Sequence, residues 1–166
     1  MIITWDLTIP QLSGDQTRRA YVYVPQSYGE DLERRYPVMY FFDGQNIFFD
    51  DDATFGTSWG MEGYMLESER EMILVAVEYS PFTFENSELG RIKGRGKQYM
   101  HWLIKELKPY IDETYRTLPD RENTMIAGSS MGGLMALYAA TTFNSVFQRA
   151  ACLSPSLWVA PGKILE

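Results

Sequence analysis

The stretch from Thr124 to Ala140 constrains the fold more than any other part of the sequence. It begins with a short apolar run, Met125 to Ala127, which predicts a buried strand, and continues through Gly128-Ser-Ser-Met-Gly132, which predicts a sharp turn. Leucine and tyrosine then recur among alanines at helical spacing, so a helix is expected after the turn. A strand, a tight turn and a helix in this order form the context in which a G-x-S-x-G motif acts as a nucleophile elbow.

The residue types within this turn favour the same interpretation. A serine on such a turn holds its hydroxyl clear of the backbone, which makes Ser130 the candidate nucleophile and Ser129 the residue before it. Glycines at positions 128, 132 and 133 leave room for the strand and the helix to approach each other. The backbone N–H of Met131 opens the helix and points where an oxyanion would form. The alternative is a glycine-rich turn without chemistry. A phosphate-binding loop is excluded, because no Lys-Ser or Lys-Thr pair follows the glycines.

The composition bounds the class of protein. A chain of 166 residues, 45% of them apolar, is long enough for one globular domain with a sizeable core, and residues 1–166 contain no internal repeat or domain boundary. The net charge of −7 and the lack of a long basic stretch argue against nucleic acid and anionic membrane surfaces as partners. No cofactor is expected.

The cysteine count and the first residues set further limits. Cys152 is the single cysteine, so no intramolecular disulfide or multi-cysteine metal site is expected, and its apolar surroundings predict a small core residue. The first residues lack the basic start and the long apolar region of a secretory signal, and no segment is long enough to cross a membrane. A cytoplasmic location is therefore the default expectation.

Alternation and apolar runs predict the other elements. Residues 2–9 and 18–24 alternate in polarity and are expected to form a hairpin through a turn over residues 11–17. The runs 37–42 and 72–77 are apolar on both faces, as central parallel strands are, and 149–153 predicts one more strand. Helices are expected from a cap at Thr57 or Ser58 to about Ser68, and over residues 97–115. Strands that alternate with helices after a hairpin indicate an α/β fold with a mostly parallel sheet.

Some segments allow more than one interpretation. The connection over residues 78–96 is long enough to predict a lid or a binding loop. The acidic run Asp50–Asp52 predicts a solvated loop; a calcium site is the alternative, but the spacing is not that of an EF-hand. Within the helix over 97–115, His101 is in register with Lys105 and Lys108 on the polar face, so it is expected at the surface rather than in a catalytic role. The apolar stripe of that helix comprises Tyr99, Leu103, Leu107, Tyr110 and Ile111.

Four motifs, in order along the chain, resemble one known family. They are Arg35-Tyr-Pro-Val-Met-Tyr-Phe-Phe-Asp-Gly-Gln45, Glu106-Leu-Lys-Pro-Tyr-Ile-Asp-Glu-Thr-Tyr-Arg-Thr117, Ala127-Gly-Ser-Ser-Met-Gly-Gly133 and Leu153-Ser-Pro-Ser-Leu-Trp158. Together they resemble the Putative esterase family of α/β-hydrolases, which includes esterase D, feruloyl and acetylxylan esterases, and ferric siderophore esterases. The resemblance covers the chain from about Arg19 to Trp158.

The resemblance implies an α/β-hydrolase fold with strand order one-two-four-three-five-six-seven-eight and a carboxylic-ester hydrolase activity on a small-molecule ester. Ser130 would be the nucleophile, and the backbone N–H groups of Met131 and Gln45 would form the oxyanion hole. Gly44, Ser129 and Trp158 would lie near the substrate pocket. No metal is implied, and acetyl, feruloyl, thioester and siderophore esters all fit the pattern.

The sequence departs from the family at its end. In the family, the triad acid follows strand seven and the triad histidine follows strand eight, whereas this sequence ends after the sixth expected strand. The C-terminal part is therefore expected to be absent, and His101 is the only histidine. A serine hydroxyl is a poor nucleophile without a base, so this chain alone is expected to be inactive or weakly active.

The sequence is compatible with three hypotheses about function. The chain can be a serine hydrolase represented by a shortened form, a non-catalytic binding protein that retains the fold, or a subunit completed by another chain. The sixth strand would be an unpaired edge without strand seven, and its apolar residues 150–153 carry no charge that discourages pairing. A homo-oligomer through this edge is expected.

Overall fold

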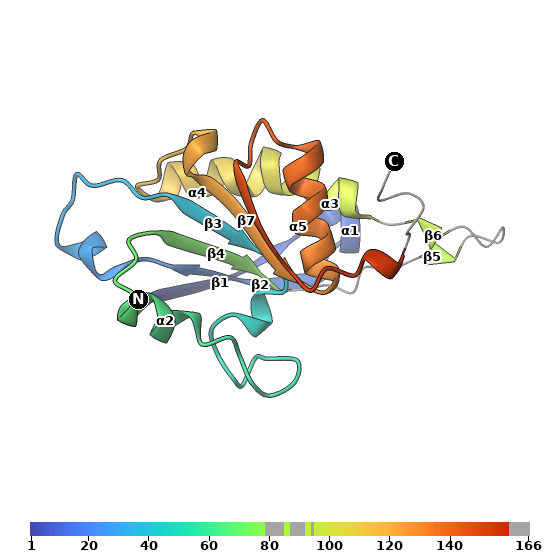
Figure 1. Ribbon diagram of the computed structural model, residues 1–166, viewed down its shortest axis with the longest axis horizontal. Coiled ribbons are helices and arrows are strands. Elements are labelled where there is room, and N and C mark those ends of the chain that lie inside the picture. The colour runs from blue at the N-terminus through green and yellow to red at the C-terminus, as the bar shows by residue number, and fades with distance from the viewer. Residues whose placement is uncertain (79–84, 87–91, 94, 160–166) are drawn as a thin grey trace.

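A six-stranded sheet organises the protein. The computed structural model describes residues 1–78, 85–86, 92–93 and 95–159, and its main sheet has the strand order β1-β2-β4-β3-β7-β8 (Figure 1). Helices cover both faces of this sheet, which confirms the predicted α/β class. Because β5 and β6 form a separate small sheet, β7 and β8 are the fifth and sixth strands of the main sheet along the chain. The observed order is then one-two-four-three-five-six, which equals the first six positions of the order implied by the family resemblance. Within the described residues, no helix has the length and apolar character needed to cross a membrane.

The first two strands form the predicted hairpin. β1 (Ile2–Thr8) pairs antiparallel with β2 (Thr17–Tyr23), with Trp5 opposite Ala20. The connection is not a simple turn, because Pro10 begins a one-turn helix, α1 (Pro10–Ser13), before the chain reverses. Proline suits the first turn of a helix, where its missing N–H leaves no hydrogen bond unmade. β2 then pairs antiparallel with β4 and joins the hairpin to the rest of the sheet.

The four other strands are parallel to one another. They are β3 (Val38–Phe41), β4 (Ile73–Val77), β7 (Thr124–Ser129) and β8 (Arg149–Leu153), and all lie within the predicted ranges or extend them by one or two residues. The residues of β4 are all buried, because helices lie over both faces of this part of the sheet. Parallel strands end at a common edge, so the segments that follow β3, β7 and β8 lie side by side.

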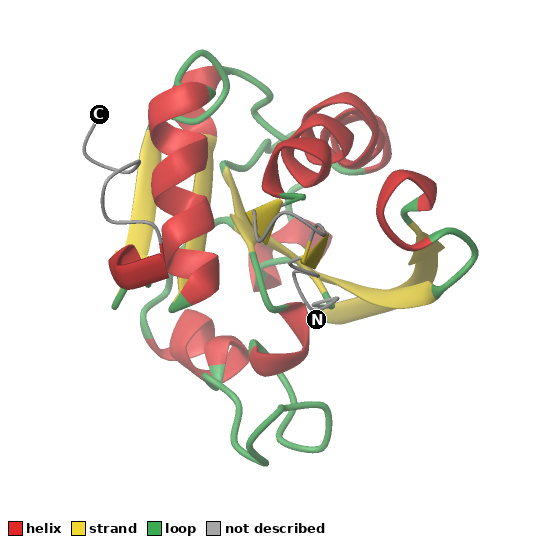
Figure 2. Cartoon of the chain, turned by 90° about the vertical axis from the view of Figure 1, so that its right-hand side faces the viewer, coloured by secondary structure: helices red, strands yellow, loops and turns green. Residues whose placement is uncertain are grey.

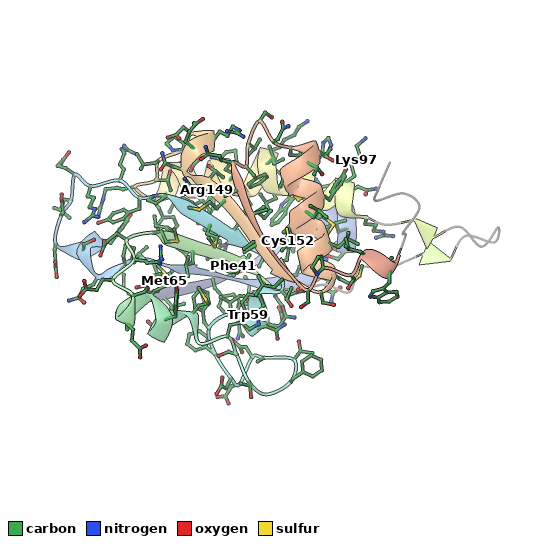
Figure 3. The ribbon with its side chains drawn as sticks, in the orientation of Figure 1. Phe41, Trp59, Met65, Lys97, Arg149 and Cys152 are labelled. Atoms are coloured by element: carbon green, nitrogen blue, oxygen red, sulfur yellow. The ribbon has the colours of Figure 1, made fainter. Side chains whose placement is uncertain are left out.

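The last strand is the exception to this burial. β8 pairs only with β7 within the described residues, and all of its side chains except that of Cys152 are exposed. Cys152 is half-buried and packs against the main core, so the expectation of a core cysteine holds only in part (Figure 3). Its neighbours on β8 lack cover, which explains why an apolar sequence environment did not produce full burial.

The larger core lies between the sheet and the helices α3 (Gly96–Trp102), α4 (Lys108–Thr114) and α5 (Met131–Thr142) (Figures 1 and 2). A π-helical turn, η3 (Leu103–Leu107), joins α3 to α4. The predicted helix is therefore continuous in direction but wider in its middle. Four members of the predicted apolar stripe are buried, whereas Tyr110 is 47% exposed and packs its ring against Trp5. The π turn shifts the helical register, which explains why the stripe fails at Tyr110.

A smaller core lies on the other face of the sheet, beneath α2 (Met61–Glu67). Figure 3 shows Phe41, Trp59 and Met65 on this side, and the Phe41 and Trp59 rings meet edge to face at 6.2 Å between centroids. The predicted cap at Thr57 or Ser58 is wrong. α2 starts after Gly60, at φ 61°, while the Ser58 hydroxyl donates to Asp50 at 2.8 Å.

Short elements complete the described structure. Single 3-10 turns occur at η1 (Gln26–Gly29), η2 (Gly44–Asn46), η4 (Arg121–Asn123) and η5 (Leu157–Val159). Two short strands, β5 (Glu85–Asn86) and β6 (Ile92–Lys93), pair with each other within the predicted lid segment. Most of that segment lies outside the described residues.

The tight contact between η2 and β4 yields a first prediction. A Cβ atom on Gly44 would lie 2.5 Å from the backbone carbon of Val77, a distance that only a backbone shift can relieve. We expect Gly44→Ala to lower the free energy of unfolding by about 1–3 kcal/mol, as overpacked substitutions do. Urea denaturation measures this change.

Gly63→Ala is the matched control, because a Cβ there meets no heavy atom within 4 Å and lies inside a helix. Alanine should stabilise that position by about 0.5–1 kcal/mol. Equal stability changes in the two variants would contradict the role of the Gly44–Val77 contact.

Candidate active site

Backbone strain gathers at one edge of the sheet. The neighbouring parallel strands β3, β7 and β8 are each followed closely by a non-glycine residue with positive φ: Asp43 at 59°, Ser130 at 54° and Ser154 at 43°. The fourth such residue among those described, Glu69, lies elsewhere, after α2. A positive φ costs free energy in a residue with a Cβ, and such residues cluster at functional sites. This edge is therefore the candidate active site.

Ser130 lies at the predicted turn between β7 and α5, with φ 54° and ψ −115°. Its backbone is held on both sides, because its N–H donates to the Leu153 carbonyl at 2.9 Å and its carbonyl accepts from Leu134 N–H at 3.0 Å. The Ser130 residue itself is exposed. The first N–H groups of a helix have no intrahelical acceptor, so α5 presents free donors and the positive end of its dipole beside this hydroxyl.

Glycine is required where the strand meets the helix. A Cβ on Gly128 would lie 2.3 Å from the carbonyl oxygen of Gly132, and a Cβ on Gly132 would lie 2.7 Å from a carboxylate oxygen of Asp43. The expectation that these residues leave room for a close approach of strand and helix is confirmed. The same contact brings the turn after β3 against the start of α5.

The segment after β8 contributes a residue that sequence reasoning missed. The hydroxyls of Ser130 and Ser156 lie 3.1 Å apart, within hydrogen-bond distance, and the Ser156 backbone N–H donates to the Ser130 carbonyl at 3.0 Å. Ser156 is 4% exposed. No periodicity or spacing singles out Ser156, since the two serines are 26 positions apart in the sequence and the whole of α5 lies between them. Only its place within a quoted motif was a signal.

The turn η2 brings Gln45 to the same edge. Phe42 N–H donates to the Ala127 carbonyl at 3.0 Å, so this turn leaves β3 directly beside the end of β7. Gln45 is half-buried and Gly44 is buried. The Gln45 side-chain amide donates to the Thr54 hydroxyl at 3.3 Å, and Asn46 accepts from Thr54 N–H at 2.9 Å. These bonds tie the turn to the loop that precedes α2.

The other predicted pocket residues lie along the same edge. Ser129 is half-buried at the end of β7. Trp158 lies in η5, two residues after Ser156, and its side chain is 78% exposed. The described residues cover little of this side chain, so Trp158 is available for contact with a ligand or another segment.

His101 lies on α3 and is half-buried, with its ring edge-on to Phe143 at 5.8 Å between centroids. It lines a cavity of about 540 Å³ together with Trp102 and Lys105. The expected position on an open polar face is therefore only partly right, because Phe143 covers one side of the ring. Among the described residues, the side chain that hydrogen-bonds to the Ser130 hydroxyl is Ser156 and not His101.

The acidic run Asp50–Asp52 has structural partners. Asp50 accepts from the backbone N–H and the hydroxyl of Ser58, both at 2.8 Å. Asp52 forms an ion pair with Arg19 at 3.1 Å and accepts from the Tyr21 hydroxyl at 2.9 Å. Within the described part of the chain, no group of three or more potential metal-ligating side chains is arranged to hold a metal ion.

Asp43 is the titratable group with the most unusual environment at this edge. Its carboxyl group packs against Gly132, and burial raises its pKa from the ordinary value of 3.8 to about 6. Removal from water disfavours the charged form of a carboxyl group. The native state thus binds this proton more tightly than the unfolded state does, so the contribution of Asp43 to stability falls as the pH rises from 3.8 to about 6.

This shift predicts a pH-dependent effect of Asp43→Asn. Asparagine keeps the shape and tolerates positive φ, but it carries no charge to desolvate. We expect the variant to be more stable than the unchanged protein by up to about 3 kcal/mol at pH 7, with the difference vanishing below pH ~4. Urea denaturation across this pH range measures it. A variant that is less stable at every pH would contradict the assignment.

Comparisons with known proteins show which sequences and structures this chain resembles. The YbbA protein of Bacillus subtilis is 23% identical over 150 residues, which cover 85% of this chain and 58% of that protein. An endo-1,4-beta-xylanase/feruloyl esterase of Xylanibacter ruminicola is 28% identical over 134 residues, 74% of this chain and 17% of that protein. An IroE-like serine hydrolase from Shewanella oneidensis has a similar structure, with a TM-score of 0.74 at 22% identity, over 99% of this chain and 54% of that one.

The chain therefore spans little more than half the length of these similar proteins, apart from the xylanase/feruloyl esterase, of which it spans less. The solved structure shows that the fold is that of an α/β-hydrolase. The family model described as "Putative esterase" matches residues 13–163, which include every element of the candidate site. On this evidence, the chain belongs to the Putative esterase family of α/β-hydrolases.

Proposed function

We propose that this protein acts as a serine hydrolase on a small-molecule carboxylic ester, with Ser130 as the nucleophile. The observation that carries the proposal is the strained turn at Ser130, which exposes a hydroxyl at the N-terminus of α5. A serine at φ 54° has an unfavourable backbone conformation, and the close packing of Gly128 against Gly132 holds the chain in it. A purely structural glycine-rich turn would not require a serine with an exposed hydroxyl at this strained position.

In the proposed reaction, the Ser130 oxygen attacks the ester carbonyl and its proton passes to a base. The backbone N–H groups of Met131 and Gln45 stabilise the oxyanion that forms. The carbon–oxygen bond to the alcohol then breaks, the alcohol takes up a proton, and an acyl-serine remains. Water hydrolyses this intermediate, which releases the acid and restores the hydroxyl.

The proposed reaction needs a base that accepts the Ser130 proton, and no described residue is bonded to Ser130 in that role. Among the described residues, the Ser130 hydroxyl is hydrogen-bonded to Ser156, and a second serine does not accept a proton as histidine does. Enzymes that lose triad members keep only ~10³–10⁴-fold catalysis over water, which comes from the oxyanion hole and substrate binding. We therefore expect residues 1–166 alone to react slowly.

The substrate class rests on the family and on the named activities of similar proteins. One relative is named a feruloyl esterase and one similar structure a serine hydrolase. The exposed Trp158 beside the site suits an apolar or aromatic part of an ester. Gly44 and Ser129 would line the same pocket.

Labelling with an alkyl fluorophosphonate tests the nucleophile. The serine oxygen forms a bond to phosphorus as fluoride leaves, and mass spectrometry then locates the modified residue. We expect the protein expressed from its complete reading frame to be labelled at Ser130, and Ser130→Ala to abolish labelling and ester hydrolysis. The 166-residue chain alone should be labelled more slowly or not at all.

His101→Gln is the matched control, because the imidazole packs on Phe143 and, among the described residues, the hydrogen-bond partner of the Ser130 hydroxyl is Ser156. Labelling should proceed at an unchanged rate in this variant. Undiminished labelling of Ser130→Ala would refute the nucleophile. Specific ligand binding without any labelling would favour the non-catalytic alternative.

We also infer that the 166-residue chain associates through β8. This strand has one hydrogen-bonded neighbour among the described residues, and its exposed residues include Ala150, Ala151 and the 46% exposed Leu153. Unpaired backbone N–H and C=O groups next to apolar side chains favour strand pairing between copies. A two-fold symmetric dimer satisfies both edges at once.

Sedimentation equilibrium of the 166-residue chain tests this assembly. We expect a dimer at micromolar concentration, and we expect Ala151→Lys to shift it to the monomer because two lysines would face each other across the edge. Ser145→Lys adds the same charge at an exposed position in the turn after α5 and should leave the dimer intact. A monomer for the unchanged chain at high concentration would rule out the pairing.

A further inference from the structure

We propose that Ser156 is a positioning residue that donates a hydrogen bond to the Ser130 oxygen and favours its deprotonation. The inference rests on the proposed role of Ser130 as the nucleophile. It gives a chemical role to the hydroxyl contact between the segment after β8 and Ser130.

Three hydrogen bonds join this segment to the elbow. Ser130 N–H donates to the Leu153 carbonyl at 2.9 Å, Ser156 N–H donates to the Ser130 carbonyl at 3.0 Å, and the two hydroxyl oxygens are 3.1 Å apart. Both the backbone and the side chain of Ser130 are thus hydrogen-bonded to the same short stretch, residues 153–156. A displacement of Ser156 would displace the nucleophile as well.

Packing holds Ser156 in this position. The positive φ of Ser154 redirects the chain after β8, and a Cβ on Gly133 would lie 2.8 Å from the Leu153 carbonyl oxygen and 3.2 Å from the Pro155 Cα. The Ser156 carbonyl accepts from Val159 N–H at 3.2 Å, which closes η5. The segment therefore lies directly on the first turn of α5, and Ser156 has little freedom to move.

Either hydroxyl can be the donor in this hydrogen bond, and the difference in burial between the two serines favours Ser156. Ser156 is 4% exposed, and within the described structure its hydroxyl has a single hydrogen-bond partner, the Ser130 oxygen. Ser130 is exposed, so its own proton can point outward to a base or to water. If Ser156 donates, its proton bonds to the Ser130 oxygen, and the Ser130 proton stays free to pass to a base. The reverse direction would aim the reactive proton at a buried group that is not a base.

A donated hydrogen bond becomes stronger as negative charge develops on its acceptor. When the proton leaves Ser130, the neutral bond from Ser156 becomes charge-assisted, and such bonds are roughly twice as strong. Ser156 would therefore stabilise the alkoxide more than the hydroxyl. It would also hold the oxygen in one rotamer, which lowers the entropic cost of attack.

The rate of fluorophosphonate labelling as a function of pH tests this role in the protein expressed from its complete reading frame. We expect Ser156→Ala to label about tenfold to a hundredfold more slowly, with the pH profile displaced to higher pH. Ser156→Thr keeps a hydroxyl and should recover most of the rate and the original profile. Ser145→Ala removes an exposed hydroxyl away from the site and should behave as the unchanged protein.

Two outcomes would overturn the proposed role of Ser156, and a third would overturn the nucleophile assignment as well. Ser156→Ala with an unchanged rate overturns the proposal. A slower rate with an unmoved pH profile and no rescue by threonine shows a role in packing alone, and it overturns the proposal too. Thermal unfolding of all variants separates this case from a loss of fold. If the unchanged protein is not labelled at Ser130, the nucleophile assignment fails, and the role of Ser156 fails with it.

Discussion

The contact between the backbones of Gly128 and Gly132 is the constraint on which the site depends. The end of β7 and the first turn of α5 approach so closely that a Cβ at Gly128 would lie 2.3 Å from the Gly132 carbonyl oxygen. This approach forces the chain to turn sharply at Ser130, and the turn lifts the hydroxyl out of the sheet edge. The larger core beneath α5 stabilises the arrangement, because Ala136 and Ala139 of this helix are fully buried against the sheet.

The parallel sheet brings the remaining parts of the site to the same edge. Asp43, Ser130 and Ser154 follow three neighbouring strands, and each holds a positive φ that an isolated peptide would avoid. The strained backbone of Ser130 is held by hydrogen bonds to Leu153 and Ser156, the residues on either side of the Ser154–Pro155 pair. A loop with this much strain persists only where the surrounding structure determines it fully.

Membership of the Putative esterase family and the partial coverage of similar proteins together indicate which parts of the proposed site this chain contains. The family model covers residues 13–163, whereas this chain spans 58% of YbbA and 54% of the IroE-like hydrolase. The proposed nucleophile, the proposed oxyanion donors and the segment that carries Ser156 all lie within residues 13–163. Under the proposed function, the described residues supply the groups that attack the ester and stabilise the oxyanion. β8 lies at the edge of the sheet beside them, with most of its side chains exposed.

The sequence by itself determined the fold class, the six strands of the main sheet and the candidate nucleophile, because apolar runs and the glycine-serine turn are local patterns. It predicted the cap of α2 and the exposure of Tyr110 wrongly, since the Asp50–Ser58 hydrogen bond and the π turn η3 override local preference. Only the tertiary structure showed that Ser156 reaches Ser130 and that the half-buried Asp43 packs against Gly132. Both contacts join residues far apart in the chain, and no sequence period encodes a distance between the ends of neighbouring strands.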